Sequence, residues 1–120
     1  MKKQQLGKAG EELACRLLKK QGYRLVEKNY RCSHGEIDIV ARHKDMLVFV
    51  EVRGKSGASF GSPEESVTKL KKQRLVAAAL DYIASHRGLP EDWRIDLVAI
   101  QFNPEGGKPA RAEILQNIID

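Results

Sequence analysis

Cysteine is scarce in this chain of 120 residues, which contains only Cys15 and Cys32. The two fall in different expected elements and lack the Cys-x-x-Cys spacing of zinc sites and redox motifs. The sequence therefore indicates neither a disulfide framework nor a structural zinc site. Because free thiols are typical of a reducing compartment, we expect a cytoplasmic protein.

Long hydrophobic runs are also missing. No stretch approaches the roughly 18 apolar residues of a membrane span. The amino-terminal sequence MKKQQLGKAGEELA is charged and contains no apolar segment of signal-peptide length. The sequence therefore predicts no membrane partner.

Proline and aromatic residues are few, with four prolines and 6% aromatics, and no repeat or low-complexity tract is visible. Hydrophobic residues make up 42% of the chain and charged residues 31%, which is the composition of a folded globular protein. We expect one domain of ordinary size over residues 1–120. Trp93 and the scattered tyrosines do not suggest a platform for stacking nucleic-acid bases.

Acidic residues are outnumbered, with 16 Asp and Glu against 21 Lys and Arg, so the formal net charge is +5 at pH 7. A positive charge attracts polyanions over long distances. Many basic domains bind no nucleic acid, so the charge alone assigns no partner.

The hydrophobic spacing predicts the element order α-β-β-β-α-β, followed by a strand or short helix within residues 110–119. Helices are expected over residues 5–21, ended by Gly22, and from Pro63 to about His86, capped by Ser62. Strands are expected over 23–31, in a hairpin within 35–55, and over 93–102. Helices on both faces would make an α/β sandwich around a mixed sheet.

The hairpin carries acids among its apolar residues. Side chains alternate between the faces of a strand, so one apolar face is expected to hold Ile37, Ile39, Ala41, Val48, Val50 and Val52. With a turn at residues 43–46, pairing on the other face places Asp38 opposite Glu51 and Glu36 opposite Arg53. Two carboxylates with Cβ atoms ~5 Å apart repel each other unless one takes a proton or a cation lies between them.

A divalent cation is one solution, because Mg²⁺ is commonly held by one or two carboxylates together with waters and substrate phosphates. Asp38 and Glu51 are therefore candidate metal ligands and catalytic residues, with Arg53 and Lys55 on the same face beside them. A carboxylate pair, a metal and a cation suit phosphodiester hydrolysis. The alternative is a patch of surface ion pairs on an exposed sheet face.

The segments around the acidic pair resemble a known family. An Asp on one strand and Glu-x-basic on the next resemble the PD-(D/E)xK nuclease superfamily. The segments GKAGEELA, GEIDIVA, VFVEVRGK, FGSPEESVTKLKKQRL and RIDLVAI resemble the YraN-like proteins, an uncharacterised bacterial family related to Holliday junction resolvases. The resemblance implies a restriction-endonuclease-like three-layer sandwich, Mg²⁺ or Mn²⁺ at Asp38 and Glu51, and a nucleic-acid substrate, with DNA favoured over RNA. The resolvase relatives suggest a homodimer.

The basic residues depart from the family pattern. The family usually has Glu-Val-Lys-x-Arg, whereas Glu51 is followed here by Arg53 and Lys55 in the opposite order. Arginine stays protonated and cannot act as a general base, although it binds phosphate oxygens well. Three outcomes stay open: the metal alone activates water, Lys55 reaches back into the site, or Arg53 pairs with Glu36 in an inactive site.

Two further acids are of interest. Glu11 borders the apolar stripe of the first helix, and it matches a superfamily glutamate that helps to bind metal; an exposed helix acid is the alternative. Asp96, on the expected strand 93–102, is either a polar group near the core or a partner for Arg94 across a neighbouring strand.

Two cations of the second helix, Lys71 and Arg74, fall on the same stripe as Leu70 and Leu75. Cations on an inward-facing stripe need anions nearby. They would either contact nucleic-acid phosphates or extend past the margin of the core to solvent.

The sequence thus predicts a metal-dependent nuclease-like protein that acts on DNA, and the resolvase relatives favour branched or structured DNA. Two alternatives stand beside it. One is a catalytically inactive nucleic-acid-binding module on the same fold, and the other is a protein-interaction adaptor.

Overall fold

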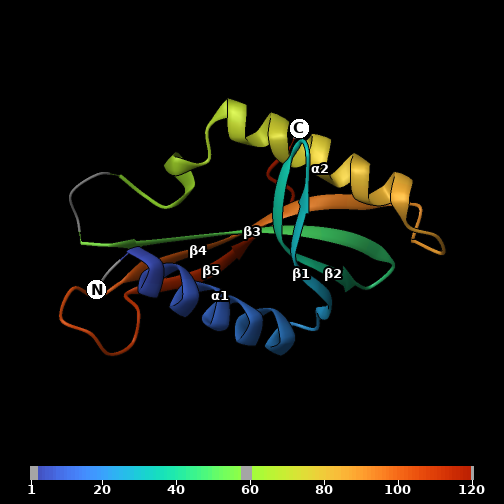
Figure 1. Cartoon of the computed structure of the whole chain (residues 1–120). Helices are drawn as coiled ribbons and strands as arrows, with labels where there is room; N and C mark the ends of the chain where they lie inside the picture. Colours follow the sequence, from blue (N-terminus) through green and yellow to red (C-terminus); the bar gives the residue numbers. More distant parts are fainter. Residues whose placement is uncertain (1–2, 58–60, 120) are drawn as a thin grey trace.

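The computed structural model describes residues 3–57 and 61–119, with side chains of the first helix described from residue 7 (Figure 1). The predicted order α-β-β-β-α-β is confirmed, and the element left open near the end is a strand. The elements are α1 (Lys3–Lys20), β1 (Arg24–Cys32), β2 (Gly35–His43), β3 (Met46–Ser56), the single 3-10 turn η1 (Glu64–Ser66), α2 (Lys69–Ser85), β4 (Trp93–Phe102) and β5 (Arg111–Leu115).

The five strands form one mixed sheet in the order β1-β2-β3-β4-β5. β1, β2 and β3 pair antiparallel, β3 and β4 pair in parallel, and β5 returns antiparallel to β4. A parallel pair needs a crossover connection, which α2 makes on one face of the sheet, while α1 covers the other face (Figure 1). Within the described residues, neither helix is long and apolar enough to cross a lipid bilayer.

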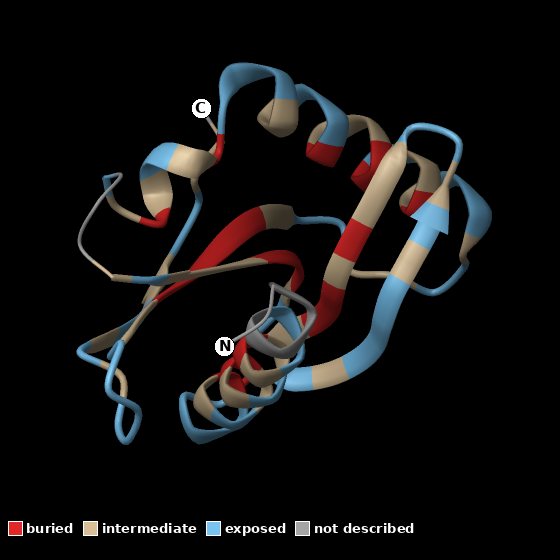
Figure 2. Cartoon of the chain, turned by 60° about the vertical axis from the view of Figure 1, so that its left-hand side comes forward, coloured by how far each residue is buried: buried red, intermediate tan, exposed pale blue. Residues whose placement is uncertain are grey.

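Two hydrophobic clusters fill the space between the sheet and its helices. Figure 2 shows the buried segments on the central strands and on the inner side of α2. The cluster under α1 contains Ala14, Leu18, Tyr23, Ile39, Ala41, Val48, Val50, Val98 and Ile100. The cluster under α2 contains Ile37, Val40, Leu47, Phe49, Val67, Leu75, Ala78, Ala79, Tyr82, Ile95, Leu97 and Ala99. Apolar residues of opposite parity on β3 and β4 thus fix the two helices on opposite faces.

The expected apolar face of the hairpin is wrong at one residue. Its other five members lie on the α1 side as predicted, but Ile37 is buried under α2. β2 pairs with β3 only from Ile39 to His43, and before Ile39 it pairs with β1 alone. The ribbon of β1 and β2 curls away from the sheet there (Figure 1), so the alternation of faces does not carry across Asp38.

α2 begins later than the sequence predicts. Ser62 and Glu65 do form a capping box, since Ser62 Oγ accepts a hydrogen bond from the Glu65 N–H at 3.3 Å and Glu65 Oε1 accepts one from the Ser62 N–H at 3.2 Å. The box starts only η1, because Val67 is buried with a non-helical backbone (φ −88°, ψ 88°). Thr68 then caps α2 by accepting a hydrogen bond from the Lys71 N–H at 3.1 Å.

A buried polar network lies under α1. Asp96 is fully buried, and its carboxylate accepts hydrogen bonds from Arg94 Nε at 2.9 Å, the Tyr23 hydroxyl at 2.8 Å and the Asn117 N–H at 2.9 Å. Arg94 also lies 2.8 Å from His43 Nδ1 through Nη2. Asp96 therefore pairs with Arg94, but along its own strand and not across strands. The network ties β4 to the end of α1, the hairpin turn and the segment after β5.

We expect Asp96→Ala to lower the free energy of unfolding by about 3–5 kcal/mol, because it leaves Arg94 and the Tyr23 hydroxyl without their buried acceptor. Urea unfolding followed by circular dichroism measures the loss. The control is Glu113→Ala, whose carboxylate is 47% exposed and pairs with Arg111 at 2.9 Å. A surface pair of this kind contributes at most about 1 kcal/mol, so equal losses in both variants would contradict the role given to Asp96.

Candidate functional site

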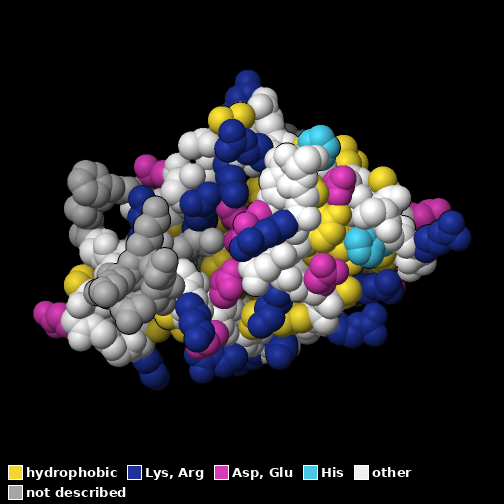
Figure 3. Space-filling view, viewed as in Figure 1, with side chains coloured by type: hydrophobic (Ala, Val, Ile, Leu, Met, Phe, Trp, Pro, Cys, Tyr) yellow, Lys and Arg dark blue, Asp and Glu magenta, His cyan; other side chains and the backbone are white. Residues whose placement is uncertain are grey.

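An acidic pocket of about 710 Å³ lies where α1 faces the point at which β2 leaves β3. Three of the predicted site residues line it, namely Glu11, Asp38 and Arg53. Glu51 lies against Asp38 and Arg53. Figure 3 shows acidic side chains grouped at the centre of this face with Lys and Arg side chains around them.

The separation of β2 from β3 positions Asp38. The ladder between the two strands ends at the pair Ile39 and Val50. Asp38 then bonds to β3 through its side chain, because Oδ2 accepts a hydrogen bond from the Val52 N–H at 2.8 Å. A carboxylate thus takes the place of a backbone partner and is held next to Glu51. The two carboxyl groups meet as the hairpin pattern led us to expect, although the backbone ladder stops one residue before them.

Glu51 is almost fully buried, at 3% exposure, and contacts two cations. Its Oε2 accepts a hydrogen bond from Arg53 Nε at 3.1 Å and lies 3.3 Å from Lys71 Nζ. Burial, followed by the hydrogen bond and the charge of Asp38, raises the pKa of Glu51 to about 8, while Lys71 and Arg53 act in the opposite direction. At neutral pH without a metal, the carboxyl pair therefore avoids repulsion by keeping a proton.

Glu11 reaches the same pocket from α1. Burial and the negative charges of Asp38 and Glu36 raise the pKa of Glu11. The predicted pairing of Glu36 with Arg53 is wrong, because this part of β2 pairs with β1, where Glu36 lies opposite Arg31. The two side chains form an ion pair of 3.5 Å. Arg53 is bound to Glu51 instead, with Nη2 3.1 Å from Oε2.

The surroundings of Lys71 were only partly predicted from the sequence. The sequence predicts that Lys71 contacts nucleic-acid phosphates or extends to solvent, and in the structure its ammonium group lies 3.3 Å from Glu51 Oε2. The sequence did hold a signal, since a lysine on the inward stripe of a helix requires an anion. The sequence could not identify this anion. It is Glu51, which lies on β3, in the sheet that α2 covers.

The remaining predicted cations lie outside the pocket. Lys55 is half-buried on β3 opposite Gln101 of β4, and it does not belong to the residues that line the acidic pocket. Arg74 is exposed, and so is Leu70 at 54%, so the predicted inward stripe is wrong at both positions. The sequence predicts that the helix begins at Pro63, but the non-helical Val67 precedes α2, and the buried residues of α2 are Leu75, Ala78, Ala79 and Tyr82.

The oxygen donors of the pocket are of the kind that hard divalent cations take. Asp38 and Glu51 provide two adjacent carboxyl groups, and Glu11 provides a third on the pocket wall. Across residues 3–57 and 61–119, no three His, Cys, Asp or Glu side chains are already close enough together to hold a metal ion. The donor set fits Mg²⁺ or Mn²⁺ bound by two carboxylates, with waters in the other positions.

The raised pKa predicts a pH-dependent stability. Glu51 has an ordinary pKa of 4.5 when unfolded and one of about 8 in the fold. Its contribution to the free energy of unfolding is therefore present in full below about pH 4.5 and is lost as the pH rises towards 8. Glu51→Gln cannot titrate, so we expect its stability relative to the original chain to rise by on the order of 1–3 kcal/mol between about pH 5 and pH 8.

Urea unfolding at several pH values without divalent cations measures this difference. The control is Glu105→Gln, because Glu105 is an exposed acid in the loop between β4 and β5. Its profile should run parallel to that of the original chain. Parallel profiles for Glu51→Gln as well would show that Glu51 does not keep its proton in the fold.

The chain is similar to many bacterial proteins that share one family name. A UPF0102 protein of Anaeromyxobacter dehalogenans is 45% identical over 100 residues, covering 83% of this chain and 75% of that protein. One of Roseiflexus castenholzii is 50% identical over 97 residues (79% and 77%), and one of Desulfosudis oleivorans is 41% identical over 118 residues (98% and 92%). The model of the uncharacterised protein family UPF0102 matches residues 10–100, a range that includes Glu11, Asp38, Glu51, Arg53 and Lys71. The chain belongs to the UPF0102 family.

Proposed function

We propose that this chain is a metal-dependent, nuclease-like protein that hydrolyses phosphodiester bonds in DNA. The observation that carries the proposal is the pair of Asp38 and Glu51, two carboxyl groups held in contact beside a pocket. A divalent cation could replace the proton that the raised pKa of Glu51 keeps on this pair, and perturbed acids of this kind are concentrated at functional sites. Asp38 and Glu51 would bind Mg²⁺ or Mn²⁺, and Glu11 would assist.

The resemblance to YraN-like proteins and resolvases extends the proposal. The extended proposal includes a restriction-endonuclease-like sandwich. The mixed sheet between α1 and α2 is compatible with that fold. The extended proposal also includes branched or structured DNA as the substrate, a homodimer as the acting form and a cytoplasmic location. The cations around the acidic pocket support a polyanionic substrate (Figure 3).

The bound metal would polarise the scissile phosphate and lower the pKa of an attacking water. Arg53 lies on the pocket wall and keeps its charge, so it is suited to a phosphate oxygen and unsuited to accepting a proton. Arg74, exposed on α2, and Lys55, on β3, are assigned to the DNA backbone.

Lys71 offers an answer to the exchanged order of Arg53 and Lys55. Its ammonium group lies 3.3 Å from Glu51 Oε2, which places a lysine beside the acidic pair. A lysine presents a compact ammonium group that can hold a water or a phosphate oxygen, whereas an arginine binds phosphate through a planar fork of donors. Lys71 is therefore the residue we assign to orienting the water, with Arg53 in the phosphate-binding role.

A binding module without chemistry is the second candidate. It is favoured by the fact that Glu51 Oε2 already contacts both Arg53 and Lys71, so the acidic pair is neutralised by the protein's own groups. Such a module would bind DNA in a salt-dependent manner and would cut no strand at any concentration of Mg²⁺ or Mn²⁺.

The first test is cleavage of labelled duplex and four-way-junction DNA with Mg²⁺ or Mn²⁺. We expect Asp38→Asn to lower the cleavage rate at least about 100-fold, because a ligand of the metal is lost, and to leave DNA binding nearly unchanged. Glu105→Gln is the matched control, since it removes one exposed acid that does not line the pocket.

Each outcome of this test has a distinct meaning. Equal cleavage by the original chain and Asp38→Asn would assign the activity to another site or a contaminant. Salt-dependent binding without cleavage would identify the binding module. Failure to bind any DNA or RNA at low salt would favour a protein-interaction adaptor over both.

The second test separates the roles of the two cations. Lys71→Arg keeps the charge beside Glu51 but replaces the compact ammonium group, so the water is held less well and we expect a loss in the single-turnover cleavage rate of about 100-fold. Arg53→Lys keeps a phosphate-binding cation and should lose much less. A small loss for Lys71→Arg, with DNA affinity unchanged in both variants, would mean that Lys71 acts only through its charge.

A further inference from the structure

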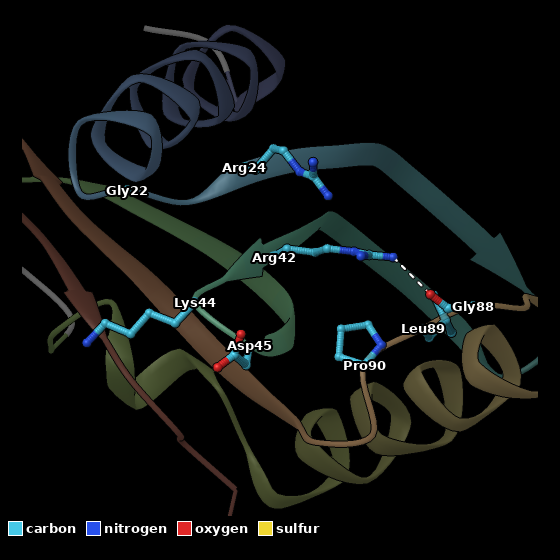
Figure 4. A pocket seen from close by; sticks show the side chains of 8 residues that line it. All are labelled: Gly22, Arg24, Arg42, Lys44, Asp45, Gly88, Leu89 and Pro90. Carbon is cyan, nitrogen blue, oxygen red and sulfur yellow. Dashed lines mark hydrogen bonds between the residues drawn. The ribbon is translucent and has the colours of Figure 1, made fainter.

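A basic pocket of about 530 Å³ lies at the turn end of the β2–β3 hairpin (Figure 4). It is bounded by the start of β1, the turn between β2 and β3, and the loop between α2 and β4. Its lining includes three cations, Arg24, Arg42 and Lys44, and one acid, Asp45. Positive charge therefore exceeds negative charge around this space.

Two of the cations face each other across adjacent strands. Arg24 of β1 and Arg42 of β2 are direct partners in the antiparallel register. Like charges in this position repel each other and destabilise the pair. Among the residues that the structure describes, no carboxylate lies within ion-pair distance of either guanidinium group. This basic pair is thus the counterpart of the acidic pair, but no opposite charge of the described residues forms an ion pair with it.

The guanidinium groups are also directed to the same place. Figure 4 shows both side chains extending towards the loop between α2 and β4, whereas Lys44 points away from them. Arg42 donates one hydrogen bond through Nη2 to the Gly88 carbonyl at 3.2 Å, which fixes its direction and leaves other N–H groups for a ligand. A side chain placed at Gly22 or Gly88 would meet no atom within 4 Å, so the space beside them is open.

We propose that this pocket binds a phosphate group through Arg24 and Arg42. The planar guanidinium group matches the oxygens of a phosphate with paired hydrogen bonds, and an anion between the two arginines would replace their repulsion by attraction. The pocket lies four residues along β2 from Asp38, which is at most about 13 Å at the rise of a strand. It therefore binds a phosphate other than the one at the acidic pair.

The phosphate can come from a nucleic-acid backbone or from a free phosphate or nucleotide. The first source rests on the proposed function, because it makes the pocket an anchor for the same DNA at a distance from the cleaved bond. The second source does not depend on it. The chemistry of the site is the same in both cases, so one pair of variants tests both.

The test compares Arg24→Gln/Arg42→Gln with a control of equal charge, Arg16→Gln/Lys108→Gln, whose residues are exposed and lie outside the pocket. Both double variants are measured in EDTA, so that no metal-dependent cleavage can occur. Because Arg24→Gln/Arg42→Gln relieves repulsion, we expect it to unfold at the same temperature as the original chain or higher. Its thermal unfolding curve also verifies that it folds.

In the first measurement, inorganic phosphate is added at constant ionic strength. It should raise the unfolding temperature of the original chain and of the control, and it should leave Arg24→Gln/Arg42→Gln unchanged. In the second, affinity for duplex DNA is measured against salt. A backbone contact predicts that this variant binds about 10-fold more weakly and that its log–log salt slope falls by about 1, while the control changes less.

A phosphate effect with an unchanged DNA slope would identify a free phosphate or nucleotide as the ligand. A reduced DNA slope would identify the backbone. No phosphate effect together with identical DNA behaviour of the two double variants would overturn the proposal. Absence of all DNA binding would count against the proposed nuclease function, and the phosphate measurement alone would then decide on the pocket.

Discussion

The hydrogen bond from the Val52 N–H to Asp38 Oδ2 is the contact on which the local architecture depends. It replaces the backbone pairing that ends at Ile39 and Val50, so β2 stays attached to β3 by a side chain while the ribbon of β1 and β2 turns away. The turn moves Ile37 to the α2 side and opens space beside α1. One local change in pairing thus produces the acidic pocket.

The second consequence of this contact is electrostatic. Asp38 is fixed against Glu51, and the buried Glu51 keeps a proton while Arg53 and Lys71 contact its Oε2. A proton and a divalent cation would compete for the same pair of carboxyl groups. The two cations belong to different elements, β3 and α2, so the charge balance of the site also depends on how α2 packs on the sheet.

Local patterns in the sequence predicted most of the elements. Alternation and helical spacing identify neighbours within a strand or helix, so the strands, the hairpin register at Val40 and Phe49, and the meeting of Asp38 and Glu51 follow from them. The wrong predictions are those that depend on how the elements are arranged in space. The curl of the ribbon displaced Ile37 and paired Glu36 with Arg31, and a non-helical Val67 shifted the phase of α2.

Contacts between distant segments were the part that the sequence could not provide. Lys71 was recognised as a cation in need of an anion, but Glu51 could be named only once α2 was placed. The basic pair of Arg24 and Arg42 lies on two paired strands. Their register shifts at a bulge between Leu25 and Glu27, so a regular alternating register does not predict that Arg24 faces Arg42. The buried network around Asp96 likewise joins positions that no motif connects.

The sheet has its strands in the same order as the chain, which bears on how the protein folds. β1, β2 and β3 form a continuous meander of local contacts, and such contacts form quickly because little chain entropy is lost in closing short loops. The acidic pair is contained in this meander, whereas Lys71 arrives only when α2 docks. Burial is the largest cause of the raised pKa of Glu51, and it too is completed only when α2 docks. Proton uptake by the acidic pair and docking of α2 are therefore coupled, so hydrogen-ion concentration acts on the last step of assembly.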